Sequence, residues 1–196
     1  PDDMRLLKQA GINILTLNVF SWASIQPSED TYDFSRLDRI MKLAAENGMK
    51  ICLATGTGAV PAWMAHRHPD ILRTDNKGIK RKFGGRENFC PNSPTFMKYA
   101  PALAGKLAEH YRDNKDIWAW HVSNEYSGRC FCENCEKKFR IWLKDKYGTI
   151  EELNHAWYTP FWGHDYYDFD EIVVPDERSE EFADGERTTA QCESLD

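Results

Sequence analysis

The chain has 196 residues, of which 41% are hydrophobic and 13% aromatic, and its formal net charge is −6. This length fits about one domain with a sizeable core, and no apolar run is long enough to predict a membrane span. Eight acidic and two basic side chains between Asp176 and Asp196 account for the whole net charge, so no basic stripe for nucleic acid is expected.

Apolar periodicity predicts alternating strands and helices in the first part of the chain. Residues 12–20 are rich in β-branched and aromatic side chains, which favours a strand. Ser35 and Asp38 form a variant of the capping box, and the apolar spacing that follows predicts a helix ending at Gly48. A second strand is expected over residues 50–55.

The stretch 59–92 contains several prolines and glycines, which predicts a long irregular loop of the kind that usually has a function. Beyond this loop the pattern alternates again. We expect a helix capped by Ser93 with Pro94 in its first turn, a strand over 117–123, a helix over 133–147 and a short helix capped by Thr149.

This order of elements predicts an α/β fold with a parallel sheet. Polar residues follow the ends of the buried strands, as in a (β/α)₈ TIM barrel, where the chemistry lies at the carboxyl ends of the strands. Three strands are too few for eight, so the chain is expected to be either part of a barrel or an open sheet. After Pro175 the pattern fades, and the acidic segment over residues 176–196 is expected to be a loop or poorly ordered.

One strand end carries a candidate catalytic carboxylate, Glu125, directly after Asn124. Glycosidases use two carboxyl groups, one of which must be protonated near neutral pH, and apolar surroundings or a second carboxylate raise its pKa. Trp118, Trp120 and Tyr126 are candidates for apolar walls. The Asn-Glu pair alone is a weak signal, because helix-entry loops often contain such residues. The strand before it and the chain's seven tryptophans, which suit sugar binding, strengthen it.

Three cysteines within six residues predict a metal site: Cys130, Cys132 and Cys135. Tetrahedral Zn²⁺ requires four ligands, so the sequence leaves the fourth open among Cys90, Cys52, Cys192 and the histidines. The alternative interpretation is a set of free or disulfide-paired thiols.

The chain resembles the catalytic barrel of family 42 glycoside hydrolases, the bacterial β-galactosidases, from residue 1 to about 175. The segments that carry the resemblance are Ala10–Asn13, Val19–Ala23, Tyr32–Phe34, Leu53–Thr55, Pro61–Trp63, Phe83–Arg86, Trp120–Tyr126, the cysteine cluster, Phe139–Leu143, Leu153–Trp157 and Phe161–Trp162.

The resemblance implies that residues 1–175 form part of a (β/α)₈ TIM barrel as the catalytic domain, and it implies a role for each matching residue. Glu125 would be the acid/base, Asn124 and Arg86 would bind the galactose, and Trp162 would form part of the pocket wall. It also implies structural zinc on four thiolates and a homotrimeric, cytoplasmic parent enzyme. The zinc ligands would be Cys90, Cys130, Cys132 and Cys135.

The sequence departs from the family pattern at Gln26, where Glu is usual, at Asp30, where Gly is frequent, and at Ser123, where many members have Asp. The nucleophile of the family is a glutamate on a later strand, which this sequence does not contain. We therefore expect the chain alone not to hydrolyse a β-galactoside. A non-catalytic carbohydrate-binding or zinc-stabilised interaction fragment is the alternative.

Overall fold

A computed structural model describes residues 2–126 and 128–179, except for the side chain of Trp162. The chain divides into two compact units. Unit 1 comprises Pro1–Leu72 and Phe83–Gly128, and unit 2 comprises Arg73–Lys82 and Arg129–Asp196. Residues 180–196, most of the predicted acidic segment, lie outside the described part. Within the described residues, no helix has the length and apolar character to cross a membrane.

Unit 1 is built on a parallel sheet in the order β1-β2-β3. The strands are β1 (Ile14–Leu17), β2 (Lys50–Ala54) and β3 (Ile117–His121), and each lies within or matches its predicted range. Its helices are α1 (Asp2–Gln9), α2 (Trp22–Ile25), α3 (Ser35–Glu46), α4 (Ala62–Arg67), the 3₁₀ turn η1 (Pro69–Ile71) and α5 (Pro94–His110).

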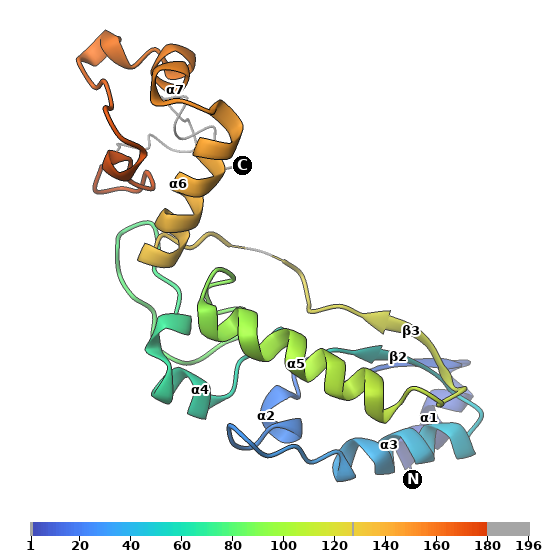
Figure 1. The fold of residues 1–196 in the computed structure, drawn as a ribbon. Coiled ribbons are helices and arrows are strands. Elements are labelled where there is room, and N and C mark those ends of the chain that lie inside the picture. Colours follow the sequence, from blue (N-terminus) through green and yellow to red (C-terminus); the bar gives the residue numbers. More distant parts are fainter. Residues whose placement is uncertain (1, 127, 180–196) are drawn as a thin grey trace. The chain divides into compact units, whose positions relative to one another are not determined.

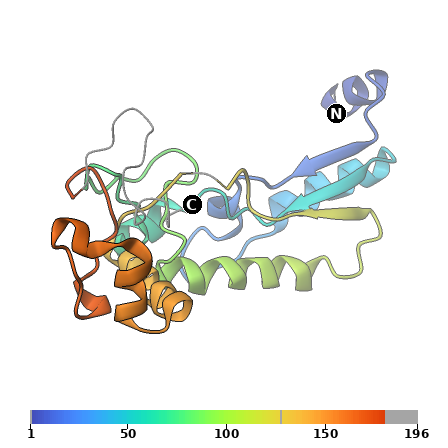
Figure 2. The same cartoon turned by 90° about the horizontal axis from the view of Figure 1, so that it is seen from above.

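Helices α3 and α5 connect the strands and cover one face of the sheet (Figures 1 and 2). The strand side chains that alternate toward this face meet the apolar stripes of the two helices in one core. Fully or nearly fully buried members include Leu37 and Met41 of α3, Ile51 and Leu53 of β2, and Leu103 and Leu107 of α5. Spacings of two on the strand and four on the helices are those that place side chains on one face.

Two predictions in unit 1 were wrong. The N-cap of α3 is Phe34 rather than Ser35, and the backbone N–H of Ser35 is bound instead by the Asp33 carboxylate at 2.8 Å. The irregular stretch 59–92 contains α4 and η1, because Met64 and Ile71 are fully buried in the core and fix these short turns. The predicted cap of α5 is confirmed, since Ser93 Oγ accepts from the Phe96 N–H at 3.2 Å.

Unit 2 contains α6 (Glu133–Tyr147), α7 (Ile150–Trp157), η2 (Thr159–Trp162) and η3 (Phe169–Glu171). The bounds of α6 agree with the prediction, and Thr149 caps α7 through the Glu152 N–H. A small core holds the unit together through Phe139, Leu143, Leu153, Ile172 and Val174.

Candidate active site at the carboxyl ends of the strands

The predicted polar residues do lie at the carboxyl ends of the three strands in unit 1. Asn18 follows β1, and its side-chain amide donates to the Ala54 carbonyl at the end of β2. Thr55 follows β2, and its hydroxyl accepts the Ser123 N–H at 2.9 Å. These hydrogen bonds connect the three strand ends into one rigid edge, because each spans a large sequence separation and involves buried groups.

Glu125 lies beyond the end of β3 and is ion-paired with Arg86, with 2.6 Å between Nη1 and Oε2. The guanidinium of Arg86 also lies over the Phe20 ring, 5.9 Å from its centroid. Both charged side chains are more than half exposed, so the pair contributes little to stability. Exposed charges held this close leave both groups able to exchange partners with an incoming polar ligand.

Asn124 is hydrogen-bonded to the residue that follows Arg86 in the sequence. Its Nδ2 donates to the Oε1 of Glu87 at 3.2 Å, and the Glu87 N–H donates to the Gly58 carbonyl at 2.8 Å. Three of the predicted site residues, Arg86, Asn124 and Glu125, are therefore brought together. Sequence reasoning missed Glu87, for which the only signal was its position next to Arg86.

The predicted apolar walls do not enclose Glu125 within the described residues. Trp118 is 70% exposed and Tyr126 is 80% exposed, while the Glu125 side chain itself is 65% exposed. In a barrel, strands and loops on both sides contribute to the mouth, whereas unit 1 has three strands and β3 is an edge. The side chain of Trp162, the third predicted substrate contact, lies outside the described residues.

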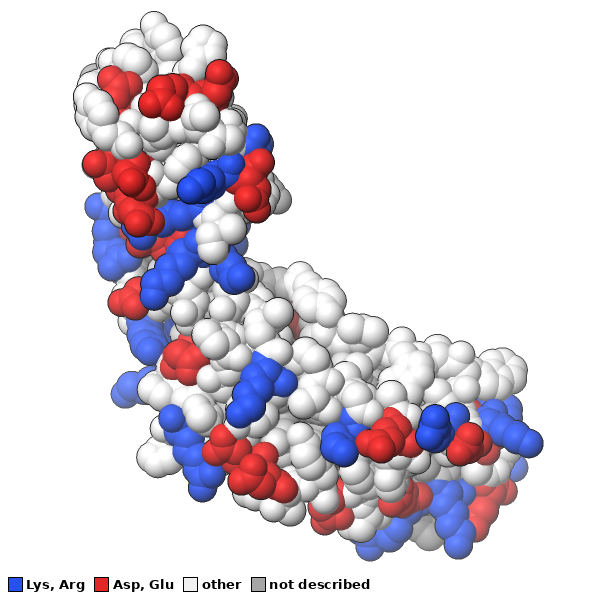
Figure 3. Space-filling model, in the orientation of Figure 1, with Lys and Arg blue, Asp and Glu red and all other residues white. Residues whose placement is uncertain are grey.

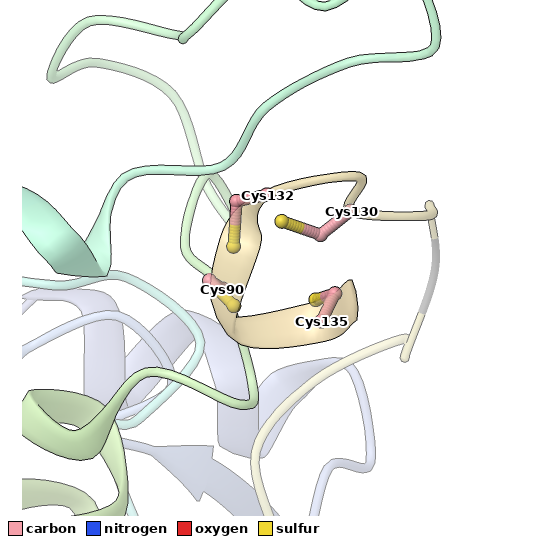
Figure 4. A group of neighbouring side chains, drawn as sticks. All are labelled: Cys90, Cys130, Cys132 and Cys135. Carbon is pink, nitrogen blue, oxygen red and sulfur yellow. The ribbon is translucent and has the colours of Figure 1, made fainter. Parts of the chain in front are cut away.

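The predicted metal ligands form a cluster (Figure 4). The sulfur atoms of Cys90, Cys130, Cys132 and Cys135 all lie within 4.8 Å of one another. Tetrahedral Zn²⁺ with Zn–S distances of about 2.3 Å places its sulfurs about 3.8 Å apart, so a small contraction of this cluster would fit the ion. Of the candidates that the sequence left open for the fourth ligand, Cys90 is the one in the cluster.

A carboxylate at the carboxyl end of a parallel β-strand, beside an arginine and an amide that can bind hydroxyl groups, is the arrangement of a glycoside hydrolase built on a (β/α)₈ barrel. The sequence model of glycoside hydrolase family 42, described as beta-galactosidase, matches residues 1–190. The chain belongs to this family.

Individual relatives agree with the assignment. The beta-galactosidase BgaP of Planococcus sp. (strain L4) is 57% identical over 93% of this chain, and LacZ of Heyndrickxia coagulans is 49% identical over 89%. The crystal structure of the beta-galactosidase from Bacillus circulans sp. alkalophilus superposes on 93% of this chain with a TM-score of 0.91 and 59% identity.

The chain spans about a quarter of these relatives, 27% of the length of each of the three. The family match and the superposition on a solved beta-galactosidase confirm the prediction of a partial TIM barrel and exclude an open sheet. The three β-strands with their helices are consecutive units of that barrel.

Proposed function

We propose that this chain supplies the acid/base half of a retaining β-galactosidase, which hydrolyses terminal non-reducing β-D-galactosyl residues by double displacement. The observation that carries the proposal is the position of Glu125 at the carboxyl end of β3, within 2.6 Å of Arg86. The names of the relatives, all beta-galactosidases, supply the substrate class.

In the proposed first step, a second carboxylate attacks the anomeric carbon while the glycosidic C–O bond breaks and Glu125 donates its proton to the departing oxygen. In the second step water attacks the anomeric carbon, Glu125 takes its proton, and the bond to the second carboxylate breaks, which releases the sugar with retained configuration. Arg86, Asn124 and Trp162 bind the sugar in this scheme. The second carboxylate would lie about 5–5.5 Å from Glu125, on a strand of the barrel outside this chain, so the chain alone is not expected to turn over substrate.

Four thiolates suit Zn²⁺ by chemistry and by spacing, and we infer that the cysteine cluster of Figure 4 binds it. Four protein ligands leave no coordination position for water, so the ion would be structural rather than catalytic. A complete protein of this kind is further proposed to be a cytoplasmic homotrimer, as its family resemblance implies, and light scattering of the purified enzyme would measure the trimer.

The test uses a complete enzyme that carries this segment, with Glu125→Ala and Glu125→Gln variants. Substrates with poor leaving groups need the general acid and should lose about 10²- to 10⁴-fold in kcat, whereas aryl galactosides with good leaving groups should lose less in the first step. Azide should then restore turnover of the Ala variant and yield β-galactosyl azide, because an anionic nucleophile needs no general base.

Glu109→Gln is a matched control. Glu109 is also a largely exposed glutamate with one ion pair, to Lys106 at 3.2 Å, yet it lies on α5 away from the strand ends. Equal effects of the Glu109 and Glu125 substitutions, or a product of azide rescue with inverted configuration, would sink the proposed role of Glu125.

A further inference from the structure

The residue after Arg86 is another glutamate, Glu87, whose carboxylate has no role in the proposed mechanism. Its side chain is buried, with 8% of the residue exposed. Burial of a carboxylate is costly unless hydrogen bonds compensate for the lost hydration, so a buried glutamate one residue from the proposed site requires a reason.

Glu87 connects three segments of unit 1. Its carboxylate accepts from Asn124 beyond β3, its backbone N–H donates to Gly58 beyond β2, and its own loop carries Arg86. The backbone of Glu87 has a φ of 55°, a left-handed conformation that a residue other than glycine adopts only at some cost. Glycine would adopt this conformation at lower cost. We therefore expect the role of Glu87 to lie in its side chain rather than in its backbone.

Asn124 has no comparable support from its neighbour. The hydroxyl of Ser123 is buried and has no hydrogen-bond partner among the described residues, so it does not orient the amide. On the other side, Gly58 lies so close that a Cβ atom there would come within 3.1 Å of the Asn124 Cβ. Gly58 therefore limits the position of the Asn124 side chain, and the hydrogen bond to Glu87 orients its amide.

We propose that Glu87 is a positioning residue, whose carboxylate holds one Nδ2 hydrogen of Asn124 and so fixes which amide atoms face the sugar. With that hydrogen committed, Asn124 presents Oδ1 and its other Nδ2 hydrogen to the sugar hydroxyls. This inference rests on the proposed function. Hydrogen bonds to the sugar that strengthen in the transition state act on kcat more than on KM.

The test compares Glu87→Ala, Glu87→Gln and Glu87→Gly in a complete enzyme that carries this segment. The Ala variant should lose about 10- to 100-fold in kcat, since a displaced positioning group costs this much, with KM changed by less than about threefold. Gln keeps an acceptor oxygen at the same length and should remain within about fivefold of the parent. Gly relaxes the backbone but lacks the acceptor, so it should be as slow as Ala.

Each contrary pattern overturns the inference. A Gly variant as fast as the parent would make Glu87 a simple turn residue, and a Gln variant as slow as Ala would exclude the hydrogen bond as the cause. Thermal melting of each variant identifies a loss that comes from unfolding, and the soluble Gln variant still decides the question if Ala does not fold.

A double-mutant cycle tests the route through Asn124. If Glu87 acts by orienting that amide, Glu87→Ala should cost nothing further in kcat once Asn124→Ala is present, and additive losses would contradict this. The proposed function has its own contrary results: a complete enzyme without galactosidase activity, or a Glu125→Gln variant with unchanged kcat. If the complete enzyme is active, Glu125 is required and Glu87→Ala has normal kcat, only the positioning role of Glu87 is disproved.

Discussion

Backbone strain in unit 1 is concentrated around the carboxyl ends of its strands. Among the described residues of this unit, the non-glycine residues with positive φ are Asn18, Glu87, Ser123 and Glu125. Such conformations cost on the order of 1–3 kcal/mol each and persist only where neighbouring contacts enforce them. Here Ala54, Gly58 and Thr55 are hydrogen-bonded to Asn18, Glu87 and Ser123, respectively. The contact of Glu125 is its ion pair with Arg86.

Gly58 offers a test of how tightly the edge is packed. A Cβ atom at this position would come within 3.1 Å of the Asn124 Cβ and 3.3 Å of the Phe20 ring, so both neighbours must yield by a few tenths of an ångström. We expect Gly58→Ala to lower kcat/KM about tenfold, because the displaced amide lies next to Glu125. Steady-state kinetics of a complete enzyme carrying this segment would measure the loss.

The control is Gly105→Ala in the middle of α5, where an added Cβ meets nothing within 4 Å. Alanine inside a helix should stabilise the protein by about 0.5–1 kcal/mol and leave kcat/KM unchanged. A Gly58→Ala enzyme as fast as the control would show that Asn124 tolerates displacement.

Individual site residues differed in how well the sequence predicted them. Asn124 and Glu125 could be named as candidates because their position after a strand is a local pattern, and their roles stay predictions. Glu87 was missed because its role depends on a contact with Asn124 across 37 residues of chain, which no spacing rule captures. The exposure of Glu125 was also not foreseen, since burial depends on the strands around it rather than on its own.

At the scale of elements, the helices with clear end signals were predicted best. Gly148 has a φ of 75° and ends α6, and Thr149 begins α7 directly after it. The error at α3 came from two competing caps within three residues, Asp33 and Ser35, of which Asp33 binds the backbone. Helix α4 was missed because it lacks a capping side chain and begins after Pro61.

Two helices of unit 1, α4 and α5, and the residue that follows α4 contact one carboxylate, that of Glu29. It accepts hydrogen bonds from Tyr99 of α5, from Arg67 at the end of α4, and contacts the ring of His68 at 3.2 Å. The hydrogen bond from Tyr99, followed by those from Arg67 and His68, holds the pKa of the Glu29 carboxyl below its ordinary value despite an opposing effect of burial.

A lowered pKa in the folded state means that the folded form releases the Glu29 proton more readily than the unfolded chain. The contribution to stability is therefore complete above the unfolded pKa of about 4.3 and is lost as the pH falls through the lower folded value. We expect Glu29→Gln to flatten the acid limb of the stability curve at pH values below the unfolded pKa of this carboxyl. Thermal midpoints measured across this range would reveal the change, and parallel acid limbs would contradict it.

At the scale of the molecule, β3 is an edge strand of the described sheet, yet it exposes large apolar side chains as a strand from the interior of a barrel would if its neighbour were absent. Trp118 within β3 is 70% exposed, and Val122 directly after it is 65% exposed. Figure 3 shows an uncharged area on unit 1 beside areas where acidic and basic residues are mixed. A cavity of about 230 Å³ between α5 and the end of β3 is lined mostly by apolar side chains. These surfaces are where a further β/α unit of the barrel is expected to pack. The sequence predicted an incomplete barrel because it contains three strand patterns where a full barrel has eight.

The proposed zinc site gives a prediction about the stability of the folded chain. In unit 2, Cys132 is the N-cap residue of α6 and Cys135 lies in its first turn, where the positive end of the helix dipole favours thiolates. A Cys132→Ala protein should contain less than one zinc ion per chain by elemental analysis and should melt at a lower temperature, because binding free energy at a structural site contributes to folding.

Cys52→Ala is the matched control, since Cys52 lies within β2 and should leave the zinc content intact. Because a Cys₄ site leaves no position for a water ligand, chelation at a temperature where the protein stays folded should leave kcat unchanged, whereas the same chelator should lower the thermal midpoint. Loss of kcat without unfolding would instead assign the metal a part in the chemistry. An unchanged zinc content in a protein with both Cys132→Ala and Cys135→Ala would exclude the cluster as the binding site, because only two of the four proposed thiolate ligands would remain.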